Sequence, residues 1–317
     1  MIRRVLLGAC MLPIVAAVTG AAYQWVATRR ALAATPPPGR LVDVGGHRLH
    51  LWCVGSGTPT VVLETGLGGT SADWGFVQPE VARSTRVCSY DRAGMGYSDP
   101  GPSTRTARRV AHELTRLLDG GGVSGPVVLV GASIGGFSVR VFASEYAERV
   151  AGLVLVDATH EDQLDPVPRL AALVPLLSST GVLRLIRVSF GPEPDSLAPS
   201  VRAFARATQF RAAGYNAAAD EILHAHESAA EVKVIRRKLT IPVVVVTAGR
   251  GSDSGWRTLQ ADQLRLSHRG CQILAAESGH VIPIDQPGVV VDAINATVDA
   301  VKKGGRVAHC ESNPSVK

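Results

Sequence analysis

Short runs of apolar, mostly β-branched residues alternate with longer segments of mixed polarity along most of this chain. Continuous apolar runs of this length are typical of strands that are buried on both faces. Segments with helical spacing lie between several of the runs, and strands that alternate with helices predict a parallel sheet covered by helices. The expected strands fall at 60–63, 85–90, 127–130, 150–156, 241–247 and 271–275, and the expected helices include 103–118, 137–146 and 287–301.

Two further strands are expected before these, at 40–44 and 47–54. Gly45 and Gly46 lie between them, and this spacing predicts a β-hairpin because glycine supplies the backbone angles of a tight turn. The whole pattern therefore predicts an α/β protein with an eight-stranded, mostly parallel sheet, an N-terminal β-hairpin and helices on both faces. The helix over 103–118 is expected to be capped by Ser103 or Thr104.

One long interval, 160–240, carries no strand pattern, and its leucines recur at helical spacing. We expect a helical cap here, inserted after the sixth strand and flanked by core segments 40–159 and 241–303. An apolar lid over a pocket would favour an apolar substrate, although the same leucines could serve only to pack on the core. The polar end of the chain, 304–317, is expected to be a flexible tail.

The first 39 residues form a separate segment. Residues 5–26 carry no charge and are long enough to cross a bilayer. Arginines precede and follow the run, and the proline-rich stretch 35–39 is a stiff linker. We favour an uncleaved anchor, because the run is long for a signal peptide; the alternative is a cleaved signal with Ala31-Leu32-Ala33 as its A-x-A site. Both interpretations export the following domain, but arginines at both ends weaken the prediction of orientation.

The charge pattern argues against a nucleic-acid partner. The net charge is +6, but the lysines and arginines are interspersed with acids and form no basic stripe with interleaved aromatics. No cysteine–histidine spacing predicts a zinc site. Ser133 occupies the middle position that a G-x-G-x-x-G dinucleotide motif would need, and no lysine follows the glycines as in a P-loop. We therefore expect neither a metal nor a cofactor.

The strand at 127–130 runs into Gly131-Ala132-Ser133-Ile134-Gly135. A serine at the apex of a tight strand–turn–helix is exposed, and small residues two positions on either side let the strand and the helix approach. Ser133 is thus a candidate nucleophile; the alternative is a glycine-rich turn with a capping serine.

A serine hydroxyl needs a base within hydrogen-bond reach. His280 follows the last expected strand directly, so it should lie at the same sheet edge as Ser133, where parallel strands deliver their carboxyl ends. His160, close after the sixth strand, is the second candidate for the base.

These motifs, in this order, resemble the α/β-hydrolase fold superfamily over residues 40–301. The resemblance rests on the glycine loop 64–69, the segment Tyr90-Asp91-Arg92-Ala93-Gly94-Met95-Gly96-Tyr97-Ser98-Asp99, the Ser133 turn, the helical interval and Ser278-Gly279-His280. It implies a serine hydrolase without a cofactor. It also implies two oxyanion donors, the backbone amides of Leu67 and Ile134, although Thr65-Gly66 replaces the family's common His-Gly.

The acid that orients the histidine has two candidates. Most of the superfamily places it after the seventh strand, where Asp253 lies in a Gly/Ser-rich loop, and some members place it after the sixth, where Asp157 follows the strand directly. We favour Asp157, because a strand end positions a side chain more rigidly than such a loop.

The fold that the resemblance implies makes the strands of Cys53 and Cys88 neighbours. The two sulfurs could form a disulfide, or both could be free buried thiols. Export by the N-terminal segment favours the disulfide.

Together these features predict a membrane-anchored serine hydrolase with an extracytoplasmic domain, or a secreted one if the N-terminal segment is cleaved. We expect its substrate to be a small carboxylic ester with an apolar acyl or alcohol part. The same residues would also serve a peptidase, lactonase, thioesterase or cofactor-free haloperoxidase. A serine nucleophile disfavours the dehalogenase and epoxide-hydrolase branches, which need a carboxylate. A ligand-binding or sensor protein with little turnover is the non-enzymatic alternative.

Overall fold

The computed structural model describes residues 2–163, 166–190, 195–235 and 238–307. Eight strands form one sheet in the order β1-β2-β4-β3-β5-β6-β7-β8. The pairs β1–β2 and β2–β4 are antiparallel, and every pair from β4 to β8 is parallel. The predicted fold class is confirmed. The strands are β1 Arg40–Asp43, β2 Arg48–Val54, β3 Thr60–Glu64, β4 Val87–Asp91, β5 Val127–Ala132, β6 Val150–Val156, β7 Val243–Ala248 and β8 Gly270–Ala275.

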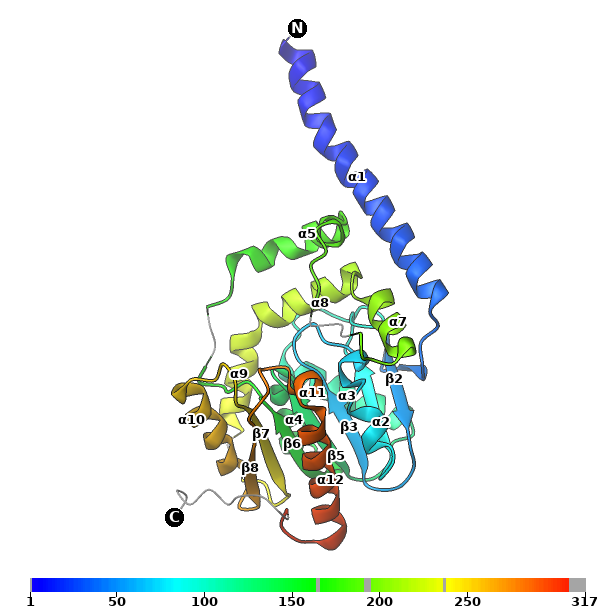
Figure 1. Ribbon diagram of the computed structural model, residues 1–317. Helices are drawn as coiled ribbons and strands as arrows, with labels where there is room; N and C mark the ends of the chain where they lie inside the picture. Colours follow the sequence, from blue (N-terminus) through cyan, green and yellow to red (C-terminus); the bar gives the residue numbers. More distant parts are fainter. Residues whose placement is uncertain (1, 164–165, 191–194, 236–237, 308–317) are drawn as a thin grey trace.

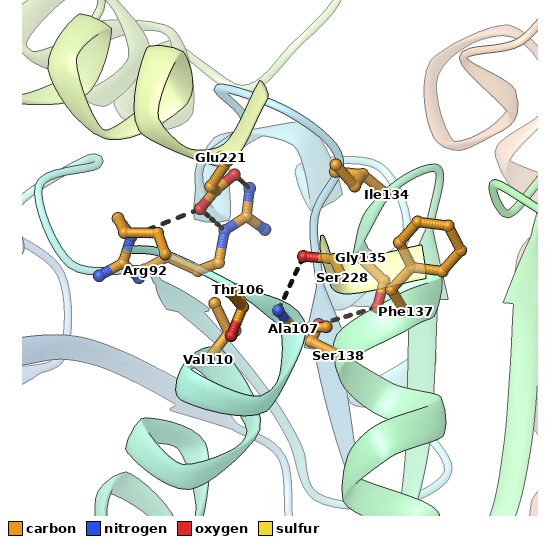
Figure 2. A pocket seen from close by; sticks show the side chains of 11 residues that line it. Arg92, Thr106, Ala107, Val110, Ile134, Gly135, Phe137, Ser138, Glu221 and Ser228 are labelled. Atoms are coloured by element: carbon orange, nitrogen blue, oxygen red, sulfur yellow. Dashed lines mark hydrogen bonds and ion pairs between the residues drawn. The ribbon is translucent and has the colours of Figure 1, made fainter. Parts of the chain in front are cut away.

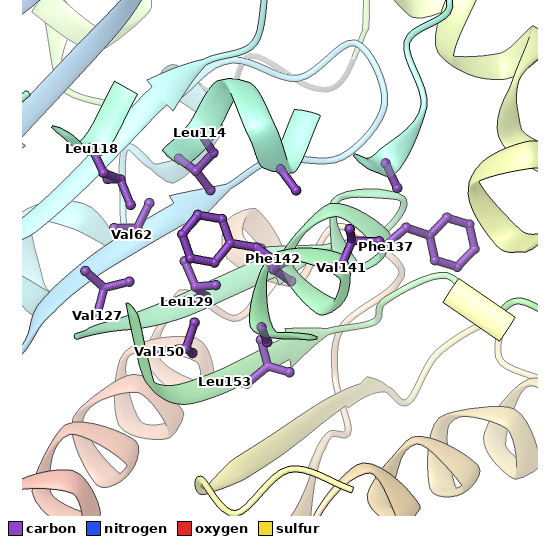
Figure 3. Close-up of a cluster of buried hydrophobic side chains, with 14 of the residues drawn as sticks. Val62, Leu114, Leu118, Val127, Leu129, Phe137, Val141, Phe142, Val150 and Leu153 are labelled. Atoms are coloured by element: carbon purple, nitrogen blue, oxygen red, sulfur yellow. The ribbon is translucent and has the colours of Figure 1, made fainter. Parts of the chain in front are cut away.

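The central strands are apolar on both sides because helices cover both faces of the sheet. On one face α3 (Ala107–Gly120) and α4 (Gly135–Glu145) pack against β5 and β6. Figure 3 shows Phe142 and Leu114 meeting Leu129 and Leu153 there. On the other face α2 (Gln78–Val81) and α12 (Pro287–Lys303) cover alternate residues of the same strands. Burial on both faces explains why the strands read as continuous apolar runs.

The helix predicted over 103–118 begins later than expected, at Ala107, and Thr106 rather than Ser103 or Thr104 is its cap. The reason is a tertiary contact: the Arg105 amide donates to Asp220 Oδ2 over 2.8 Å, which holds the preceding residues in a loop. Local capping rules could not reveal this, because Asp220 belongs to a distant part of the sequence.

The interval after β6 folds into short helices that lie above the sheet, on the side where α1 joins the molecule (Figure 1). No named strand occurs in its described part. The division into core and cap at 160–240 stays a prediction, and most of the expected tail, 304–317, falls outside the described residues. The helical elements here are η3 Arg169–Leu173, α5 Val174–Ser179, α6 Val182–Leu185, α7 Pro199–Thr208, α8 Ala212–Leu223 and α9 Ala225–Val234.

The N-terminal segment is one helix, α1 (Ile2–Ala34), that projects from the molecule (Figure 1). Its part from Met11 to Ala34 is long and apolar enough to cross a membrane, by length and composition alone. The end of α1 nearest the domain packs against α7 and α5. The linker that follows is tied to the core, since the Tyr97 hydroxyl donates to the Thr35 carbonyl.

The remaining short elements complete the core. They are η1 Ser71–Trp74, η2 Ala147–Arg149, α10 Ser254–Asp262, η4 Gln263–Leu266 and α11 Ile282–Asp285.

Candidate active site

Ser133 stands at the turn between β5 and α4 with a positive φ of 51°. Its glycine neighbours make this turn possible. A Cβ on Gly131 would lie 2.5 Å from a methyl of Val139, and one on Gly135 would collide with the Thr65 carbonyl. The strained turn therefore depends on small residues at both positions, as the sequence pattern indicated.

A continuous line of hydrogen bonds starts at the Ser133 hydroxyl. His280 Nε2 lies 2.9 Å from Ser133 Oγ, and His280 Nδ1 lies 2.6 Å from Asp157 Oδ2. The three side chains come from the carboxyl ends of β5, β8 and β6, which meet at one edge of the sheet. This is the arrangement in which a histidine can accept the serine proton while a carboxylate orients the ring.

The structure brings Asp157, and not Asp253, to His280. The second carboxylate oxygen of Asp157 accepts from the Ala248 amide over 3.0 Å and from Trp256 Nε1 over 2.8 Å. Asp157 is buried, so these bonds fix its carboxylate at the end of β6. Asp253 instead caps α10, where its side chain accepts from the Trp256 amide.

The second candidate base, His160, lies apart from this group. Its ring is buried and faces carboxylates, with Nε2 3.5 Å from Asp262 and 3.8 Å from Glu161. These contacts hold the His160 ring against acidic side chains, and the histidine that hydrogen-bonds to Ser133 is His280.

The loop after β3 lies against the serine. A Cβ on Gly66 would lie 3.1 Å from Ser133 Cβ. Within the described residues, the amides of Leu67 and Ile134 donate to no protein acceptor. Two unpaired amides close to a nucleophile are the donors that a tetrahedral oxyanion requires.

A cavity of about 350 Å³ opens at Ser133 and His280. Its wall is largely apolar and includes Leu67, Trp74 and Val281. Phe190, which follows α6, lies so close to Gly68 that a side chain at position 68 would collide with its ring. The shape of this cavity therefore depends on Phe190.

The same cavity contains one acid that the sequence reasoning passed over, Asp73. Its Oδ2 accepts from the Thr70 amide over 3.2 Å. Burial, with a further contribution from the negative Asp91, raises the pKa of Asp73 to about 7. This carboxyl therefore changes charge near neutral pH, inside the cavity that holds Ser133.

Arg92 connects the loop after β3 to α8. Its guanidinium donates to the carbonyls of Thr65 over 2.8 Å and Gly66 over 2.7 Å. It pairs with Glu64, the last residue of β3. Over 2.8 Å it also pairs with Glu221 on α8 (Figure 2). All three charges are buried. Burial alone would lower the pKa of Arg92, but the two carboxylates outweigh it and raise the pKa above its usual value.

A separate cavity of about 20 Å³ lies behind the nucleophile turn, lined by Arg92, Glu221, Ile134 and Ser138 (Figure 2). It is too small for a substrate, and Ser133 and His280 do not line it. The cavity of about 350 Å³ at Ser133 and His280 is therefore the one of these two that could hold a substrate.

Asp91, next to Arg92, holds the segments around Ser71 and Tyr97 together. Its carboxylate accepts hydrogen bonds from the Ser71 amide and hydroxyl over 2.7 and 2.8 Å, and from the Tyr97 amide over 2.9 Å. His50 Nδ1 lies 2.8 Å from it. Although burial alone would raise the pKa of Asp91, His50 and these donors lower it. The segment Tyr90 to Asp99, which carried part of the family resemblance, thus supports the site through Asp91 and Arg92.

Cys53 and Cys88 lie opposite each other in the register of β2 and β4 and form a disulfide. No group of His, Cys, Asp or Glu side chains in the part of the chain that the structure describes is arranged to hold a metal ion.

Comparison with known proteins identifies the family. A family model described as the α/β hydrolase fold matches residues 59–309. The chain belongs to the α/β hydrolase fold family. Its fold is similar to that of a thermophilic esterase from Thermogutta terrifontis, with a TM-score of 0.65, 22% identity and coverage of 84% of this chain and 99% of the esterase. At this identity the likeness shows the fold alone.

The chain is also similar in sequence to two curated proteins. It is 25% identical to protein YqjL of Bacillus subtilis over 248 residues, which cover 76% of this chain and 83% of YqjL. It is 33% identical to the probable transporter efuK of Hormonema carpetanum over 129 residues, or 38% of this chain. That match spans only 18% of efuK, so the similarity concerns a part of that protein.

Proposed function

We propose that this member of the α/β hydrolase fold family is a serine hydrolase that cleaves a carboxylic ester through an acyl-enzyme at Ser133. The observation that carries the proposal is the line of hydrogen bonds from Ser133 through His280 to Asp157 at the mouth of an apolar cavity. Membership of the hydrolase family supports an enzyme rather than a sensor that retains only the fold.

In the proposed mechanism, Ser133 Oγ attacks the ester carbonyl while His280 Nε2 takes the serine proton. The buried carboxylate of Asp157 stabilises the imidazolium and holds its orientation. The amides of Leu67 and Ile134 donate to the oxyanion of the tetrahedral intermediate. His280 then gives its proton to the departing alcohol, and water, activated by the same histidine, releases the acid.

The lining of the cavity supports an ester with an apolar acyl or alcohol part. Leu67, Trp74 and Phe190 offer apolar contacts that an aliphatic chain would fill, with roughly 0.8 kcal/mol gained for each methylene buried. Chain length should therefore affect kcat/KM until the cavity is full.

We further propose that α1 remains attached and anchors the domain to a membrane. Leu32, inside the candidate Ala31-Leu32-Ala33 cleavage site, packs against the cluster around Tyr97 and Phe204. Cleavage after position 33 would remove this contact. The disulfide between Cys53 and Cys88 supports an extracytoplasmic location, because such bonds persist in oxidising compartments.

A substrate series tests the reaction class. We expect the full-length protein to hydrolyse p-nitrophenyl esters, with kcat/KM rising from acetyl to medium acyl chains, and to leave aminoacyl amides intact. Ser133→Ala should abolish turnover without a change in thermal unfolding temperature. Faster cleavage of amides, lactones or thioesters than of the esters would assign one of those reactions instead. Equal ester turnover by Ser133→Ala would contradict the mechanism.

A further inference from the structure

One face of α1 is occupied by the cap rather than by solvent. The residues that pack there follow a helical spacing, because positions four, seven, eight, eleven and twelve after the first lie on the same side of a helix. They are Gly20, Gln24, Ala27, Thr28, Ala31 and Leu32, all buried or half-buried.

Specific contacts fix this packing. Gly20 lies so close to the Thr180 carbonyl that any side chain would collide with it. The Gln24 amide donates to the Phe210 carbonyl over 2.6 Å, and Gln24 accepts from Arg184 Nε over 2.6 Å. Arg184 also donates to Thr28 Oγ1 over 2.8 Å. These polar groups satisfy one another, as they must if water is absent around them.

Two of these α1 residues, Gly20 and Gln24, lie within the uncharged run that would cross a membrane. The uncharged run from position 5 to position 26 is roughly 33 Å long at 1.5 Å per residue, close to the thickness of a bilayer core. Gly20 is six positions before the end of that run. The cap residues that touch Gly20 therefore lie roughly 9 Å from the end of the run, along the helix axis.

The part of the cap beside this contact is unusually apolar on its surface. We define residues 170–188 as the cap edge. Among the described residues outside α1, eleven large hydrophobic side chains are exposed, and seven of them belong to the cap edge. The most exposed of these seven cap-edge residues are Leu185 at 78%, Leu170 at 72% and Ile186 at 63%. Monomeric soluble proteins rarely collect exposed apolar side chains in this way.

The charge of the same segment fits a lipid surface. Residues 166–190 contain no aspartate or glutamate. They contain three arginines; Arg184 is bonded to α1, which leaves those at 169 and 187 beside the apolar residues. Apolar residues with flanking arginines are typical of segments that lie in the interface of a bilayer with anionic lipids.

We infer that the cap edge is a second membrane-binding surface, inserted among the lipids of the leaflet that α1 enters from the domain side. The inference extends the proposed anchor, since it places part of the domain itself in the bilayer. The cap edge ends two residues before Phe190, which lines the cavity at Ser133, and the Tyr215 hydroxyl donates to the Val188 carbonyl beside it. The membrane-bound edge and the wall of the cavity are thus continuous.

Lipid photolabelling tests this inference without relying on activity. The full-length protein is reconstituted in liposomes of phosphatidylcholine and phosphatidylglycerol that contain a phospholipid with an acyl-chain diazirine, and adducts are mapped by mass spectrometry. We expect adducts on α1 and on peptides of the cap edge, and none on peptides that carry Val234 or Leu274, which are 84% and 56% exposed elsewhere on the domain.

A pair of variants sharpens the result. Leu185→Gln with Ile186→Gln should reduce labelling of the cap edge about tenfold or more while labelling of α1 persists. Val234→Gln with Leu274→Gln, of similar exposure, should change nothing. Labelling confined to α1 would overturn the inference, as would cap-edge labelling that the first variant leaves unchanged. Cross-links between cap edges of two copies, with no lipid adducts there, would assign the surface to self-association instead.

Discussion

The carboxylate of Asp157 is held by Ala248 and Trp256 while it faces His280, whereas Asp253 serves only the first turn of α10. Asp157→Asn should therefore lower kcat by about 10³- to 10⁴-fold, because the amide favours the wrong histidine tautomer. Asp253→Asn should keep kcat within about twofold, since asparagine also caps helices well. Ester turnover by the two variants, measured with their unfolding temperatures, checks this. Loss of activity in the Asp253 variant alone would contradict the assignment of the acid.

At Asp73 the expected effect is on the pH dependence of stability. Its pKa is about 7 in the folded protein and 3.8 by its usual value. Between these values the unfolded chain is ionised at this position while the folded protein keeps the proton, so Asp73 lowers stability as pH rises from about 4 to 7. The slope is at most about 1.4 kcal/mol per pH unit for one proton.

Asp73→Asn removes this titration and keeps an acceptor for the Thr70 amide. Unfolding of both proteins by urea between pH 4.5 and 7.5 measures the difference. We expect the variant to gain stability relative to the parent as pH rises, and a relative loss over this range would contradict the assigned pKa direction.

At the scale of elements, Arg92 and Glu221 join α8 to the loop that carries Leu67. Glu221→Gln leaves Arg92 with Glu64 but removes a buried partner, so it should cost about 3 kcal/mol of stability. If Arg92 positions the loop, kcat should also fall, by about tenfold, with little change in KM. Glu227→Gln, at an exposed position of α9, is the control and should alter neither quantity. If stability falls while kcat stays unchanged, the Arg92–Glu221 pair does not position the loop that carries Leu67.

The elements differ in how far the sequence predicts them. Strands β5 and β7 consist almost entirely of apolar residues because both faces are buried, so their existence and order could be predicted. His280 and Ser133 could be placed at one edge because parallel strands end there. Glu221, in contrast, meets Arg92 across 129 positions through the packing of the cap, and no local pattern announces that pairing. The predicted start of α3 was wrong because the residue before its cap contacts Asp220, which is also distant in the sequence.

At the scale of the whole molecule, α1 joins the fold on the side where the helices after β6 lie (Figure 1), and the cap edge is followed two residues later by Phe190, which lines the cavity at Ser133. This order would bring an ester with an aliphatic chain from the lipid phase to the wall that Phe190 forms. The sequence predicted a long apolar run and a helical interval after β6 as separate features. That α1 packs on this interval through Gly20 and Gln24 depends on tertiary contacts that no spacing indicates.

Covalent labelling shows whether Ser133 is a nucleophile that His280 activates. The full-length protein is treated with a fluorophosphonate, and the intact mass and the modified peptide are determined. We predict one adduct, on Ser133, with a labelling rate that falls at least about a hundredfold in His280→Ala because the serine loses its base. A folded protein that stays unlabelled, or that is labelled at another residue, would contradict the assignment of Ser133 as the nucleophile.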